Sequence, residues 1–164
     1  GAGLSGASAV HMNIFGLQPV AVFGNEEQKR RMLPPLIQGK ETTGANSIDI
    51  FDNGMPRKPG NRMIVVGGDF NADSSTEKNC VYTLNGGKTW ITPDTPPNGY
   101  RSSVEYLSKK DILTCGLNGV DYSGDGGKNW KWISKEGFHV CRIARMGTAV
   151  FLAGNNGKIG KLTW

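Results

Sequence analysis

Two arginines and one glutamate are the side chains whose types and spacing fit ligand binding best. Arg101 and Arg142 each stand near the predicted start of a β-strand, and Glu105 follows Arg101 by four residues. Guanidinium groups that converge on one point bind a carboxylate through paired, charge-assisted hydrogen bonds. We therefore expect Arg101, Arg142 and Glu105 to form a site for a carboxylate or an acidic peptide. The alternative is that Arg101 pairs with a carboxylate of its own chain.

Other reactive side chains have less informative surroundings. His11 and His139 have no nucleophilic serine or cysteine near them in sequence, so we assign no catalytic residue. Oxygen-bearing side chains alternate over residues 69–75 as in calcium loops, but the glycine and the bidentate glutamate of such loops are missing. We predict no metal site and no cofactor. The three cysteines, an odd number in apolar surroundings, predict buried free thiols.

An eight-residue pattern that occurs twice, forty positions apart, indicates the elements that position these residues. Residues 83–90 read Thr-Leu-Asn-Gly-Gly-Lys-Thr-Trp, and residues 123–130 read Ser-Gly-Asp-Gly-Gly-Lys-Asn-Trp. The Gly-Gly pairs reach positive φ easily, and the Asn or Asp oxygen can bond the backbone of its own turn, so each copy predicts a β-hairpin. The residues given this structural role are Asn85, Gly87, Trp90, Asp125, Gly127 and Trp130.

After residue 44 the apolar residues alternate with polar ones. The predicted strands cover residues 47–51, 63–67, 80–83, 90–92, 103–107, 112–116, 120–123, 130–133, 140–144, 149–153 and 158–162. Four strands in roughly 40 residues are typical of one blade of a β-propeller. The fold class predicted for residues 42–164 is therefore mainly β, a partial β-propeller of about two and a half to three four-stranded blades.

Residues 1–41 follow a different pattern and are predicted to be a separate, short α-helical segment. Ser8 can cap a helix that Gly16 and Pro19 end, and Asn25 with the following Glu-Glu-Gln predicts the start of another. The first 24 residues contain no Lys, Arg, Asp or Glu. They also lack the basic start of a signal peptide, and glycine and proline interrupt their apolar run. We therefore expect neither a membrane span nor an export signal.

The net charge of +5 arises from 19 basic and 14 acidic residues that form no long run of one sign. This predicts a solvated basic surface and no specific nucleic-acid binding. The sequence does not indicate a cellular compartment.

Residues 44–164 resemble the carboxy-terminal part of a propeller of the photosystem II stability and assembly factor type, which is related to the BNR or Asp-box proteins. The two eight-residue patterns correspond to the Asp boxes. The resemblance implies an architecture and no particular activity, because sialidases and non-enzymatic assembly factors both carry these turns.

Residues 5–33 resemble a different family, the acyl-CoA dehydrogenases, in the helical domain ahead of their flavin-binding segment. In that family the sequence continues into a strand that contacts flavin, whereas this chain continues after Glu41 with sequence that resembles a propeller. We infer a chimera joined within residues 33–41, through recombination, an error of gene prediction or deliberate joining. The flavin-contact strand and the catalytic carboxylate of that family are absent, so no dehydrogenase activity is implied.

These observations favour a non-catalytic binding or scaffolding fragment. The alternative is a sialidase-like glycoside hydrolase, for which Tyr100, Arg101, Glu105 and Asp111 supply the residue types. The predicted blades are too few to close a substrate pocket. Because an incomplete propeller has open edges, we expect a homo-oligomer, or a monomer whose helical segment covers the exposed face. A protein or peptide is the other expected partner.

Overall fold

The structure is a computed structural model that describes residues 26–27, 29–30, 43–51, 54, 60–69 and 71–162. The chain divides into two compact units, Gly1–Thr42 and Thr43–Trp164. The four described residues of the first unit are helical, as the capping pattern after Asn25 predicts. Within them, Lys29 Nζ lies 3.2 Å from a carboxylate oxygen of Glu26. The rest of the predicted helical segment lies outside the described residues.

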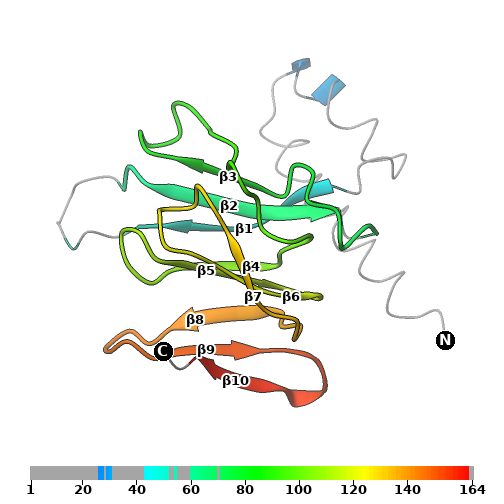
Figure 1. The fold of residues 1–164 in the computed structure, drawn as a ribbon. Coiled ribbons are helices and arrows are strands. Elements are labelled where there is room, and N and C mark those ends of the chain that lie inside the picture. Colours follow the sequence, from blue (N-terminus) through cyan, green and yellow to red (C-terminus); the bar gives the residue numbers. More distant parts are fainter. Residues whose placement is uncertain are drawn as a thin grey trace. The chain divides into compact units, whose positions relative to one another are not determined.

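The described part of the second unit consists of three antiparallel sheets (Figure 1). The first sheet contains β1 (Thr43–Ile50), β2 (Met63–Asp69) and β3 (Cys80–Thr83). The middle sheet contains β4 (Ser103–Tyr106), β5 (Ile112–Gly116), β6 (Gly119–Ser123) and β7 (Lys131–Ser134). The last sheet contains β8 (Val140–Ile143), β9 (Val150–Ala153) and β10 (Ile159–Leu162), with the short 3-10 helix η1 (Asn155–Gly157) between its last two strands.

In every sheet the strands follow one another in chain order, and the first strand, β1, β4 or β8, is an edge strand. The sheets also follow one another in chain order, each packed on the next, which is how blades are arranged in a β-propeller. The predicted mainly β fold is confirmed. Only the middle sheet has the four strands predicted for a blade, whereas the other two have three each within the described residues.

Two strands differ from the sequence prediction. The strand predicted at residues 90–92 is reduced to a bridge between Ile91 and Tyr82. Pro93 follows directly, and a residue without an N–H cannot continue a strand ladder. Strand β1 begins at Thr43, four residues before the predicted start, because a bulge between Ala45 and Ser47 allows the pairing with β2 to continue.

Two apolar clusters join the three sheets. The first lies between the first and middle sheets and contains Ile64, Val66, Cys80, Tyr82, Val104, Tyr106, Ile112 and Trp130. The second lies between the middle and last sheets and contains Leu113, Cys115, Val120, Phe138, Cys141, Val150 and Leu152. The middle sheet is therefore covered on both faces, and all of β5 is buried. The three cysteines are buried free thiols, as predicted.

Polar side chains of the first sheet cap the edge strand of the middle sheet. The N–H of Val104 donates to Ser47 Oγ at 3.2 Å. The N–H of Tyr106 donates to Asp49 Oδ2 at 2.6 Å. An edge strand carries backbone groups that no neighbouring strand satisfies, and here the side chains of the adjacent sheet satisfy two of them.

The same arrangement recurs at the next junction. The N–H of Cys141 donates to Ser103 Oγ, and the N–H of Ile143 donates to Glu105 Oε1, each at 3.2 Å. A serine and an acidic residue two positions later therefore act as the acceptors in both junctions. We call each such pair a junction pair: Ser47 with Asp49, and Ser103 with Glu105.

Candidate functional site

Arg142 and Glu105 lie together where the edge strands of the middle and last sheets meet. Arg142 Nη1 is 2.7 Å from Glu105 Oε2 and also donates to the carbonyl oxygen of Cys141 at 3.2 Å. The Arg142 side chain is 63% exposed, whereas Glu105 is 13% exposed. The carboxylate therefore holds one side of the guanidinium, and most of the arginine side chain faces solvent.

Arg101 lies in a different, buried environment. Its Nε is 2.6 Å from Asp121 Oδ2, and its Nη2 contacts the same oxygen. Its Nη1 donates to the carbonyl oxygen of Tyr100 and to the side chain of Asn118. Arg101 has no exposed surface, so a ligand could reach it only by displacing these groups. The structure thus shows the alternative contact, a local carboxylate, and does not bring Arg101 together with the Arg142–Glu105 pair.

The Arg101–Asp121 pair also joins two sheets. The N–H of Arg101 donates to the carbonyl oxygen of Gly67 in β2, while Asp121 belongs to β6. Burial raises the pKa of Asp121, and the positive charge of Arg101 acts in the opposite direction. We therefore interpret Arg101 as a structural residue that links the first and middle sheets.

The residues named for the glycosidase alternative have other partners. Asp111 accepts hydrogen bonds from the hydroxyls of Ser108 and Tyr122, and these bonds lower its pKa. Tyr100 is buried.

Within the described part of the chain, no group of three or more His, Cys, Asp or Glu is placed to hold a metal ion. No helix among the described residues is long and apolar enough to span a membrane.

The second of the two repeated turns, at residues 123–130, is closed by the Asp125 carboxylate. Its Oδ1 accepts the N–H groups of Lys128 and Asn129, each at 3.0 Å, and the Ser123 hydroxyl at 2.9 Å. Its Oδ2 accepts the Asn129 amide at 2.9 Å. Burial would raise the pKa of Asp125, but the hydrogen bonds from Asn129, Ser123 and Lys128 outweigh this and lower it.

The first repeated turn, at residues 83–90, is closed in a similar way by the neutral side chain of Asn85, with one backbone N–H fewer bound to Oδ1. Asn85 Oδ1 accepts the Thr89 N–H at 3.0 Å and the Thr83 hydroxyl at 2.9 Å. In both turns the glycine pair has positive φ, from 71° to 93°. The side-chain oxygens of Asn85 and Asp125 are occupied by hydrogen bonds within their own turns. The repeated pattern therefore stabilises the turns and supplies no reactive group.

The tryptophans that end the two turns differ in burial. Trp130 is 5% exposed, and its Nε1 donates to the carbonyl oxygen of Gly127 at 3.1 Å. Trp90 is 44% exposed. The first turn lies in the first sheet, whose outer face no other described sheet covers, and the second lies in the doubly covered middle sheet.

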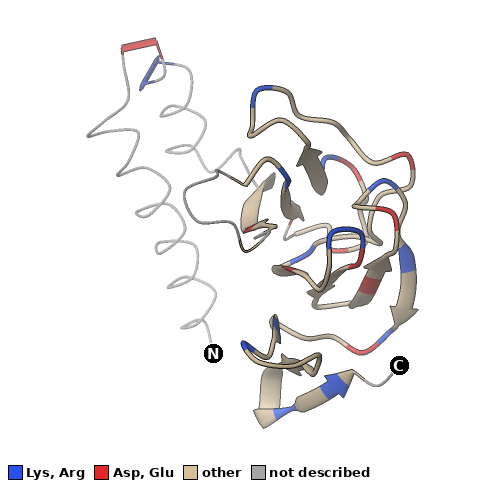
Figure 2. Ribbon diagram, turned by 90° about the vertical axis from the view of Figure 1, so that its left-hand side faces the viewer, with Lys and Arg blue, Asp and Glu red and all other residues tan. Residues whose placement is uncertain are grey.

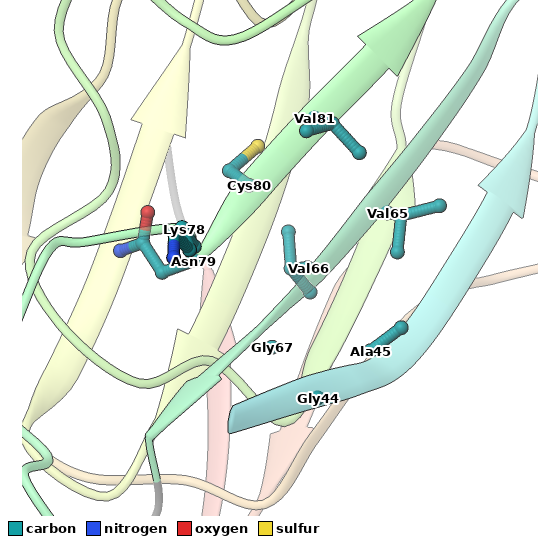
Figure 3. A pocket seen from close by; sticks show the side chains of 9 residues that line it. All are labelled: Gly44, Ala45, Val65, Val66, Gly67, Lys78, Asn79, Cys80 and Val81. Carbon is teal, nitrogen blue, oxygen red and sulfur yellow. The ribbon is translucent and has the colours of Figure 1, made fainter. Parts of the chain in front are cut away.

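A shallow pocket of about 200 Å³ lies at one end of the first sheet (Figure 3). Ala45, Val65 and Val81 line it, with Asn79 and Cys80 at the start of β3. The Asn79 amide donates to the carbonyl oxygens of Pro97 and Gly99, at 2.7 and 2.8 Å. Its lining is mainly apolar and the Asn79 amide nitrogen is committed to the backbone, although the buried Asn79 Oδ1 has no hydrogen-bond partner among the described residues. The pocket therefore has few groups for a polar ligand.

Sequence reasoning missed the junction pairs and the partner of Arg101. The signal for the junction pairs is present as Ser-Ile-Asp at residues 47–49 and Ser-Val-Glu at residues 103–105. Both tripeptides have the polar–apolar–polar alternation of an ordinary strand, so the sequence alone does not distinguish them from other strand residues. The sequence carries no comparable signal for Asp121. It stands between Val120 and Tyr122, an alternation that is typical of any strand.

Comparison with known proteins gives one match at the start of the chain. Residues 1–40 match the family model described as acyl-CoA dehydrogenase, N-terminal domain. The resemblance of the helical segment to that family is thereby confirmed, and it covers less than half of the chain. No curated protein matches the sequence.

Among solved structures, the chain is similar to one described as "YCF48 bound to D1 peptide". The two share 17% sequence identity with a TM-score of 0.49, and the match covers 74% of this chain. The chain spans 37% of the length of that solved chain.

Proposed function

We propose that this chain is a non-catalytic binding or scaffolding module built from propeller-type sheets. The observation that carries the proposal is the outer face of the first sheet, formed by Ile48, Ile50, Met63, Val65 and Val81. Ile48 is 56% exposed and Ile50 is 49% exposed. Their cross-strand partners Met63, Val65 and Val81 are half-buried. A contiguous apolar sheet face is typical of an interaction surface.

We further propose that a second copy of the chain occupies this face. Two identical apolar faces can pack on each other about a two-fold axis, which places the same residues on both sides of the interface. The carboxylate-binding role proposed for Arg142 and Glu105 concerns the opposite end of the stack of sheets. Arg101 is not part of the proposed carboxylate-binding site, because its side chain is buried.

Sedimentation velocity over a range of micromolar concentrations tests the proposal. We expect the chain to associate and Ile48→Asp to shift it toward the 17.7 kDa monomer, because a carboxylate would be desolvated in the interface. Met146→Asp is the matched control, since Met146 is 96% exposed in a turn outside this face. A wild-type chain that remains monomeric throughout, or an equal effect of both substitutions, would contradict the proposal.

A further inference from the structure

The last sheet also has one face on which no other described sheet packs. Successive side chains of a strand point to opposite faces, so the register of β8, β9 and β10 defines this face. Arg142, Phe151 and Lys161 form one cross-strand row. Val140, Ala153 and Ile159 form the other. We call these six residues the outer face of the last sheet.

The outer face of the last sheet combines apolar surface with positive charge. Phe151 is 46% exposed and Ile159 is 77% exposed. Lys161 Nζ lies 5.9 Å from the centre of the Phe151 ring, so the cation extends along the aromatic side chain. No acidic residue occurs in β8, β9 or β10, and Figure 2 marks the basic positions of the chain in blue.

The hydrogen-bonding character of this face differs from that of the two internal junctions. The backbone N–H groups of residues 104 and 106 in β4 donate to the first junction pair, and those of residues 141 and 143 in β8 donate to the second. Residues 141 and 143 are therefore the counterparts of residues 104 and 106. The junction pair Ser103 and Glu105 therefore corresponds to Val140 and Arg142. A valine side chain accepts no hydrogen bond, and a guanidinium only donates. The acceptors that would cap the edge strand of another sheet are replaced by an apolar group and a cation.

A complementary occupant must therefore supply acceptors and negative charge together with apolar side chains. Arg142 Nε and Nη2 make no hydrogen bond within the described part of the chain, while Nη1 is held by Glu105. A guanidinium fixed on one side and open on the other is suited to a carboxylate. The outer face of the first sheet, which carries no carboxylate, does not supply this match, so a second copy docked through that face is not the expected occupant.

We propose that the outer face of the last sheet binds an extended, acidic and apolar polypeptide segment. Carboxylates of the segment pair with Arg142 and Lys161, and its apolar side chains cover Phe151, Val140 and Ile159. The proposal rests on the binding function proposed above and names the class of partner at the Arg142 end of the stack.

Fluorescence polarisation with three labelled dodecapeptides tests this proposal on the full chain. The peptides alternate Glu with Leu, Glu with Ser, and Lys with Leu. We expect the Glu-Leu peptide to bind at least about tenfold more tightly than either of the others, with an affinity that falls as salt is added. Binding of the Lys-Leu peptide with equal affinity, equal binding of the Glu-Ser peptide, or no binding of the Glu-Leu peptide would overturn the proposal.

Two variants locate the binding. Lys161→Glu should weaken the Glu-Leu peptide by roughly fivefold or more, whereas Lys131→Glu, the same change at an exposed lysine of β7, should alter affinity by less than about twofold. Ile159→Ser should also weaken binding, with Met146→Ser as its control. Equal effects of the paired variants would overturn the placement on this face. Failure here leaves the sedimentation result unchanged, so the two proposals are tested separately.

Discussion

The carboxylate of Asp125 is expected to stabilise the second repeated turn in a pH-dependent way, and the chain contains its own neutral counterpart at Asn85. Asp125→Ala removes the acceptor of two backbone N–H groups, one hydroxyl and one amide. Hydrogen bonds to a charged group are worth about 1.5–3 kcal/mol each when buried, but this turn is exposed and water replaces part of them. We expect a loss of about 2 kcal/mol in the free energy of unfolding.

Asp125→Asn should cost less, about 1 kcal/mol or below, because Asn85 closes the first turn with two of the three Oδ1 contacts that Asp125 makes, one to a hydroxyl and one to a backbone N–H. The pKa of Asp125 is lowered in the folded chain, so its charge stabilises the fold above the unfolded pKa of about 3.9. That contribution is lost as the pH falls through the folded pKa. The difference between wild type and Asp125→Asn should therefore be present at neutral pH and disappear in acid.

The assay is thermal unfolding followed by tryptophan fluorescence, at neutral pH and at a series of acidic pH values. For a chain of this length 2 kcal/mol corresponds to roughly 4–8 °C in Tm. Glu77→Gln, at an exposed carboxylate for which no pairing partner is described, controls for the change in net charge. Equal loss of Tm in Asp125→Ala and Asp125→Asn, or a wild-type advantage over Asp125→Asn that persists in acid, would refute the reasoning.

Two further predictions concern the buried groups. Arg101→Met should lower the free energy of unfolding by about 3–5 kcal/mol, because it leaves the Asp121 carboxylate buried without its cation. Adding Asp121→Leu should restore most of the loss. Denaturant unfolding of both single variants and of the double variant measures this, and additive losses would show that the pair is not coupled. The three cysteine thiols should not react with Ellman's reagent in the folded chain near pH 8, and all three should react after denaturation. The reason is that all three are buried, and burial raises the pKa of Cys80 to about 12. Rapid labelling of the native chain would contradict this.

Much of the fold could be predicted from sequence because its determinants are local. The alternation of apolar residues identified the strands, and the Gly-Gly pairs identified the two turns. The strand predicted at residues 90–92 was wrong in extent because Pro93 ends the pairing after Ile91. The start of β1 was missed because a bulge is a property of the pairing with β2 and leaves little trace in one strand alone.

The candidate site was predicted only in part, because its geometry depends on which strands become neighbours. Arg142 and Glu105 meet across two sheets, whereas the sequence places Glu105 nearest to Arg101. Arg101 was given the same role from its position near β4. The sequence could not show that Asp121, twenty residues away on β6, is buried beside it. Buried charge pairs of this kind are determined by tertiary packing, whereas exposed turns are determined by a few adjacent residues.

The junction pairs also bear on how this fold avoids aggregation and how it comes apart. The edge of the middle sheet is protected by Ser47 and Asp49 of the first sheet, and the edge of the last sheet by Ser103 and Glu105 of the middle one. Local opening of one sheet therefore uncovers the edge strand of its successor in the same event. An uncovered edge is a template for pairing with another chain. The protection runs in one direction along the stack, so opening at the first sheet exposes β4, whereas opening at the last sheet uncovers no acceptor-capped edge behind it.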